Sequence, residues 1–129
     1  MDRKPPVKTG IARIWAAFFY SLDGLRHAIL NEAAFRQEVF IVVIASIALL
    51  FLPLSFAWKG LLFFATASLL VVELLNSAIE SVVDMVSPEY HDLAKRAKDL
   101  GSAAVFVSIV IALVLWCCAI FTILQDAPK

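Results

Sequence analysis

The sequence has few of the residues that build metal or redox sites in soluble proteins. Its 129 residues include two cysteines and two histidines, and Cys117 and Cys118 are adjacent. Neighbouring residues on a helix point about 100° apart and rarely form a disulfide. Two histidines beside one adjacent cysteine pair do not make a zinc pattern. We therefore interpret both cysteines as small packing residues.

The sequence also has no excess of charge of either sign. Its 11 basic residues balance 11 acidic residues, which gives no indication of a nucleic-acid partner. Residues 1–9 carry Arg3, Lys4 and Lys8, but the continuous apolar core and the cleavage site of a signal peptide are missing. We expect a basic tail there.

Apolar residues are abundant instead. They make up 62% of the chain, against roughly 45–50% in soluble domains. Three apolar stretches, residues 33–52, 60–84 and 101–124, are long enough to cross a bilayer. Asn31 is placed to cap the first of them. The sequence therefore predicts an all-α membrane protein with three transmembrane helices in a single membrane domain.

Two amphipathic segments accompany these spans. Residues 10–30 repeat apolar side chains at helical spacing, and we expect a helix that lies in the headgroup plane, with packing on the protein's own core as the alternative. Residues 88–100 predict a cytoplasmic amphipathic segment, because Ser87, Pro88 and Glu89 follow the order of a helix cap, a first-turn proline and a first-turn acid.

Basic residues are distributed unevenly between the two sides of the predicted spans. Lys59 and Lys129 are the basic residues expected on one side. The positive-inside rule places the N-terminus and the 85–100 loop in the cytoplasm and the C-terminus outside. The basic residues on the cytoplasmic side are Arg3, Lys4, Lys8, Arg13, Arg26, Arg36, Lys95, Arg96 and Lys98.

A polar face inside the second span is the main indication of function. Glu73, Asn76, Glu80 and Asp84 lie at i, i+3, i+7 and i+11, which places them along one side of a helix. A carboxylate inside a bilayer is costly, so it suggests a functional site. Glu73 lies about 10 Å deeper than Glu80 at 1.5 Å per residue. Asp84 is interpreted as a boundary residue.

The acids gather toward the cytoplasmic side, whereas the other half of the spans has a few hydroxyls such as Thr66 and Ser68. A channel needs polar groups across the whole membrane. A protein that acts on an amphiphile in one leaflet needs polar groups only on that side of the membrane, and this chain has them there. Carboxylates suit Mg²⁺ together with substrate phosphates, and a desolvated carboxylate can act as a general base. This set of polar residues fits phosphoryl transfer, although other lipid chemistry at one face of the membrane stays open. The P-loop motif and the protein-kinase motifs are absent from the sequence.

Three segments resemble the small integral-membrane diacylglycerol kinases of bacteria. They are Asn31–Glu38, Glu73–Glu80 and Arg96–Ala104, in matching order and spacing. The likeness covers about Gly10 to Trp116. It implies a homotrimer in the inner membrane, a C-terminus on the periplasmic side, and sites shared between subunits. It also implies MgATP-dependent phosphorylation of diacylglycerol to phosphatidic acid. The chain departs from the family at Leu22-Asp23, where an aromatic followed by a basic residue is frequent.

The resemblance also implies roles for particular residues. Glu73 resembles the general base, with Asn76 as the amide beside it, and Glu32 and Glu80 resemble the metal ligands, which also serve the nucleotide. The other nucleotide contacts implied are Arg13, Tyr20, Glu89, Tyr90, His91, Lys98 and Asp99. The positions implied for the lipid substrate are Arg13, Ala17, Ser21, Arg26, Glu38, Glu73, Ser102 and Trp116.

Two alternatives accompany this interpretation. An undecaprenol kinase of the same fold is the nearest, and the segments Asn31–Glu38 and Gly101–Ala104 look more like the diacylglycerol branch. The other is a non-enzymatic membrane assembly or an ion-conducting subunit, and the nearly apolar far half of the spans argues against conduction.

Overall fold

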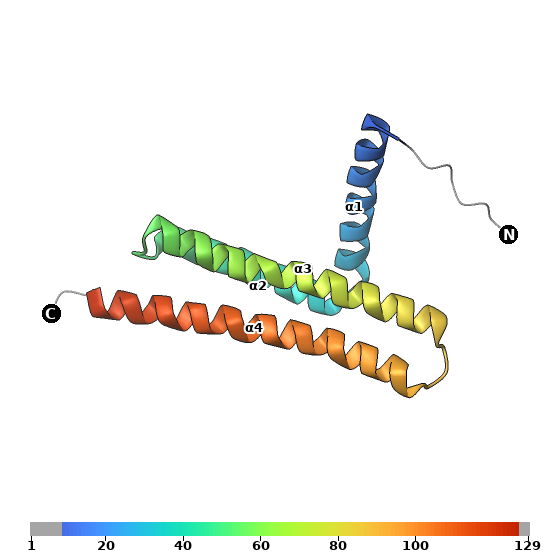
Figure 1. The fold of residues 1–129 in the computed structure, drawn as a ribbon. Coiled ribbons are helices and arrows are strands. Elements are labelled where there is room, and N and C mark those ends of the chain that lie inside the picture. The colour runs from blue at the N-terminus through green and yellow to red at the C-terminus, as the bar shows by residue number, and fades with distance from the viewer. Residues whose placement is uncertain (1–8, 127–129) are drawn as a thin grey trace. The chain divides into compact units, whose positions relative to one another are not determined.

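The computed structural model describes residues 9–126, which form four α-helices and no strand within that range (Figure 1). The helices are α1 (Ile11–Asn31), α2 (Ala33–Phe51), α3 (Phe56–Val86) and α4 (Asp92–Asp126). The chain divides into two units, Met1–Ala33 and Ala34–Lys129. The prediction of an all-α fold with three long apolar helices is confirmed. Arg3, Lys4, Lys8 and Lys129 lie outside the described residues.

The first unit contains α1, which has the amphipathic pattern expected for residues 10–30. Trp15, Phe18 and Phe19 contact one another, with ring centroids 5.7 to 6.4 Å apart, and all three are more than half exposed. Asn31 does not cap the next helix, so that prediction is wrong. Its side-chain amide donates to the His27 carbonyl oxygen at 2.9 Å, which closes the last turn of α1 instead.

The second unit contains three helices that are long and apolar enough to cross a membrane. In each helix, only a small share of the most apolar 18-residue stretch is buried within the structure: 17% in α2, 22% in α3 and 11% in α4. With 31 residues, α3 is about 46 Å long at 1.5 Å per residue, which exceeds a hydrocarbon core of about 30 Å. It begins before Gly60 because the Ser55 hydroxyl accepts a hydrogen bond from the Trp58 N–H at 3.3 Å and so caps the helix.

From Asp92 onward, the predicted segment 88–100 continues into the predicted span 101–124 as one helix, α4, whereas residues 88–91 are not helical. The prediction that Ser87 caps a helix is wrong. Its backbone N–H donates to Val83 at 2.8 Å and ends α3, while its hydroxyl donates to the carbonyl oxygen of Glu89. Asp92, in the first turn of α4, places its negative charge at the positive end of the helix dipole.

The small core of the second unit lies near the connection between α2 and α3. Leu49, Leu62 and Ala119 bring α2, α3 and α4 together there, and Trp58 and Trp116 pack against them. The most extensive backbone contact between helices is that of α3 with α4. These contacts hold together three helices that otherwise bury little surface in one another.

Replacement of Leu62 by alanine should destabilise the second unit. Leu62 is fully buried, so truncation removes packing contacts on every side and leaves a cavity, at a cost of about 2 kcal/mol or more. The midpoint of thermal unfolding in detergent micelles measures the effect. The matched control is Leu61→Ala, since Leu61 is 43% exposed. Equal midpoints for the two variants would contradict the assignment of the core.

Candidate functional site

The polar face predicted on the second span is part of the buried stripe of α3. The buried residues of this helix are Leu62, Thr66, Leu69, Glu73 and Asn76, a spacing that places all five on one side. Glu73 is 5% exposed and Asn76 is 9% exposed. Farther along the same face the carboxylates reach the surface, because Glu80 is half-buried and Asp84 is exposed. Glu73 is therefore the deep acid of the face.

Asn76 lies at a close contact between α3 and α4. Its side-chain amide nitrogen donates to Glu80 Oε1 at 3.2 Å. Its amide oxygen is buried and accepts no hydrogen bond from the residues that the structure describes. Gly101 of α4 packs directly against this oxygen, and a Cβ at position 101 would collide with it. The absence of a side chain at Gly101 leaves room for Asn76 to hold Glu80.

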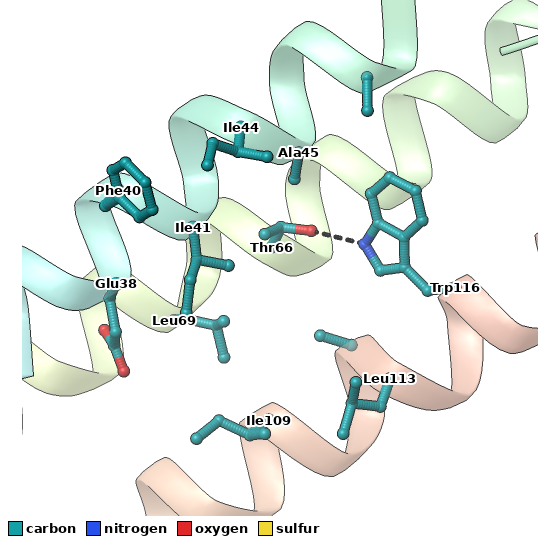
Figure 2. Close-up of a pocket in the computed structure, with 12 residues that line it drawn as sticks. Glu38, Phe40, Ile41, Ile44, Ala45, Thr66, Leu69, Ile109, Leu113 and Trp116 are labelled. Carbon is teal, nitrogen blue, oxygen red and sulfur yellow. Dashed lines mark hydrogen bonds between the residues drawn. The ribbon is translucent and has the colours of Figure 1, made fainter.

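An apolar cavity of about 470 Å³ lies between α2, α3 and α4. Figure 2 shows Glu38 at one end and Trp116 at the other, with aliphatic side chains between them. Glu38 is 8% exposed, and its Oε2 has no hydrogen-bond partner within residues 9–126. The cavity therefore combines an apolar body with one buried acid, Glu38, at one end, which suits an amphiphile.

A second cavity, of about 420 Å³, lies where α3 connects to α4. Five residues predicted to contact nucleotide line it, and their contact with nucleotide stays a prediction. Nearby, the Lys98 ammonium donates to Asp84 at 2.8 Å. The five residues are Glu89, Tyr90, His91, Lys98 and Asp99.

The remaining predicted residues lie on α1, beside it, or on α4. Arg13, Ala17 and Tyr20 follow one another at helical spacing on α1. The Ser21 hydroxyl donates to the Ala17 carbonyl oxygen at 3.0 Å. Arg26 lies on the same helix, Glu32 ends it, and Ser102 is exposed on α4 next to Gly101. Glu32 belongs to the first unit and Glu80 to the second, so their pairing as metal ligands stays a prediction.

Three features of these sites were not assigned from the sequence. Gly101 contacts Asn76, Asp84 pairs with Lys98, and Thr66 bonds Trp116. Thr66 lies seven residues before Glu73, so helical spacing alone places it on the same face. The partners in all three contacts depend on how α4 packs on α3, which a single sequence does not state.

Comparison with known proteins gives a consistent result. The family model described as prokaryotic diacylglycerol kinase matches residues 19–120. A protein of Escherichia coli named diacylglycerol kinase is 48% identical over 109 residues, which is 84% of this chain and 89% of that protein. Proteins of the same name from Pseudomonas aeruginosa and Helicobacter pylori are 46% and 40% identical, over 84% and 87% of this chain and 89% and 88% of their own lengths.

The match covers most of the chain and includes the acids of α3, the glycine beneath Asn76 and the connection between α3 and α4. With three helices able to span a bilayer, the chain is a bacterial membrane protein. It belongs to the prokaryotic diacylglycerol kinase family.

Proposed function

We propose that the chain transfers the γ-phosphoryl group of ATP to diacylglycerol and so forms phosphatidic acid. The observation that carries this proposal is the burial of Glu73 on the same stripe of α3 as Thr66 and Leu69, which line the apolar cavity. Family membership and the names of the relatives support the reaction.

Glu73 is proposed as the general base. Its carboxylate takes the proton of the lipid hydroxyl as the hydroxyl oxygen attacks the γ-phosphorus of ATP. The bond between that phosphorus and the β,γ-bridging oxygen breaks, and ADP leaves. Asn76 lies one turn away from Glu73 on the same face and holds Glu80.

The donor set fits Mg²⁺. Glu80 offers a half-buried carboxylate that Asn76 fixes through one oxygen, and Glu32 is proposed as the second carboxylate. Within residues 9–126 no three acidic, histidine or cysteine side chains gather into a complete metal site. Mg²⁺ usually binds through one or two carboxylates, with phosphates and water as the other ligands. When bound, the cation would neutralise negative charge on the phosphates.

The cavity between α3 and α4 is proposed to receive the nucleotide. Lys98 supplies positive charge there, and its bond to Asp84 holds it at the cavity. Phosphoryl transfer depends on such positioning and charge neutralisation. Arg13 and Tyr20 of α1 are proposed as further nucleotide contacts. The lipid contacts proposed beside Glu73 and Glu38 are Arg13, Ala17, Ser21, Arg26, Ser102 and Trp116.

The proposed assembly is a homotrimer with the N-terminus and the connection between α3 and α4 in the cytoplasm of a bacterium. The distribution of Lys and Arg supports this orientation. The low internal burial of the three spans supports contacts with lipid or with further copies. Incubation with labelled ATP and Mg²⁺, with diacylglycerol and undecaprenol offered separately, distinguishes the two lipid kinases. Transfer to neither lipid would favour the non-enzymatic alternative.

The variant Glu73→Gln should lose turnover, by roughly a hundredfold to ten-thousandfold, because the amide cannot accept the hydroxyl proton. ATP binding and assembly should persist, since glutamine has nearly the same shape. Initial rates in mixed micelles and equilibrium binding of ATP measure the two effects. The control Asp23→Asn removes an exposed acid of α1 and should leave the rate unchanged. Normal turnover in Glu73→Gln would rule out the base assignment.

The variant Gly101→Ala should lower kcat by roughly tenfold to a hundredfold, because the added methyl group displaces the Asn76 amide and thereby Glu80. The same assay at saturating lipid measures this loss. Gly60→Ala is the matched control, since a Cβ at position 60 meets nothing within 4 Å. Equal rates for the two variants would show that the contact with Asn76 has no part in catalysis.

A further inference from the structure

Thr66 makes a hydrogen-bonded connection between α3 and α4 inside the apolar cavity. Its hydroxyl donates to the Leu62 carbonyl oxygen at 2.7 Å and accepts from the Trp116 indole N–H at 3.0 Å (Figure 2). Thr66 is 4% exposed and lines the cavity together with Trp116. This bond is the polar contact that fixes the direction of the indole at its end of the cavity.

The indole of Trp116 has two different surroundings. It packs against the core formed by Leu49, Leu62 and Ala119, and it also lines the cavity. An indole N–H without a partner is unfavourable in an apolar interior. Because Thr66 accepts this N–H, the ring can contribute apolar surface to the cavity.

The distance along α3 between Thr66 and Glu73 relates the part of the cavity beside Trp116 to the proposed reaction. Thr66 lies seven residues before Glu73 on the same buried stripe, which is about 10 Å along the helix axis. A diacylglycerol whose hydroxyl lies at Glu73 and whose acyl chain follows the cavity passes Leu69 and then reaches Thr66 and Trp116. Short acyl chains end before that level.

We propose that Thr66 is a positioning residue that fixes the Trp116 indole against the distal part of the acyl chain and thereby contributes to the preference for long-chain diacylglycerol. The inference rests on the proposed function and assigns a part of lipid recognition to the hydrogen bond between α3 and α4. Thr66 acts through Trp116, so it affects how the chain binds and leaves the transfer step itself unchanged.

The test uses Thr66→Val, which keeps the shape of the side chain and removes the acceptor. The expected result is a rise of about fivefold in KM for dioleoylglycerol, the effect of one net hydrogen bond. KM for dibutyrylglycerol, KM for ATP and kcat should stay at wild-type values. Thr66→Ser should restore the wild-type KM. Ser68→Ala, which removes a hydroxyl bonded to Phe64 within the same helix, should change none of them.

Exchange of the Trp116 indole hydrogen with deuterium provides a readout that needs no activity. The indole resonance, identified with Trp116→Phe, should exchange faster in Thr66→Val than in the wild type. A KM that rises equally for dioleoylglycerol and dibutyrylglycerol, or that does not rise for either, would overturn the inference. The bond would then serve only to hold α3 and α4 together. A wild-type protein that phosphorylates neither lipid would refute the proposed function, and the inference with it.

Discussion

The close packing of α4 on α3 at Gly101 is the contact on which the proposed site depends. A glycine at this position lets the Asn76 amide lie against the backbone of α4, and the same amide donates to Glu80. Small residues allow such close approach where the hydrophobic effect between helices is absent. A side chain at position 101 would displace the Asn76 amide and thereby its bond to Glu80. This packing therefore sets the geometry of the acids.

The three spans bury little of one another, and this has consequences for function. Large side chains such as Phe40, Phe63, Phe64 and Phe106 are more than half exposed. In a bilayer, lipid tails or other copies of the chain can cover them without the cost of exposure to water. The space that remains between the spans is an apolar cavity with Glu38 near one end, so loose packing of α2 against the α3–α4 pair gives an amphiphile room within the membrane.

Much of the fold could be predicted from the sequence, because long apolar stretches and helical periodicity depend on local composition. The depth order of Glu73 and Glu80 also follows from spacing within one helix. The helix ends at Asn31 and Ser87 could not be predicted, because both side chains can begin a helix or close one, and the competing contacts are local. Gly101 and the Thr66–Trp116 bond required the register of α4 on α3, since their partners lie 25 and 50 residues apart in the chain.

Along the buried stripe of α3, the chemical character of the side chains changes with position. Thr66, Glu73 and Glu80 are each separated by seven residues, or about 10 Å, on one face. The hydroxyl of Thr66 is satisfied within the protein and borders an apolar cavity. Glu73 is a buried acid, and Glu80 is an acid near the surface. Going from the apolar interior toward the surface, these surroundings match an acyl chain, a lipid hydroxyl and a phosphate, which is the order of groups along a diacylglycerol during phosphorylation. In the proposed reaction, α3 thus aligns all three parts without the phosphate-binding loop that P-loop kinases use.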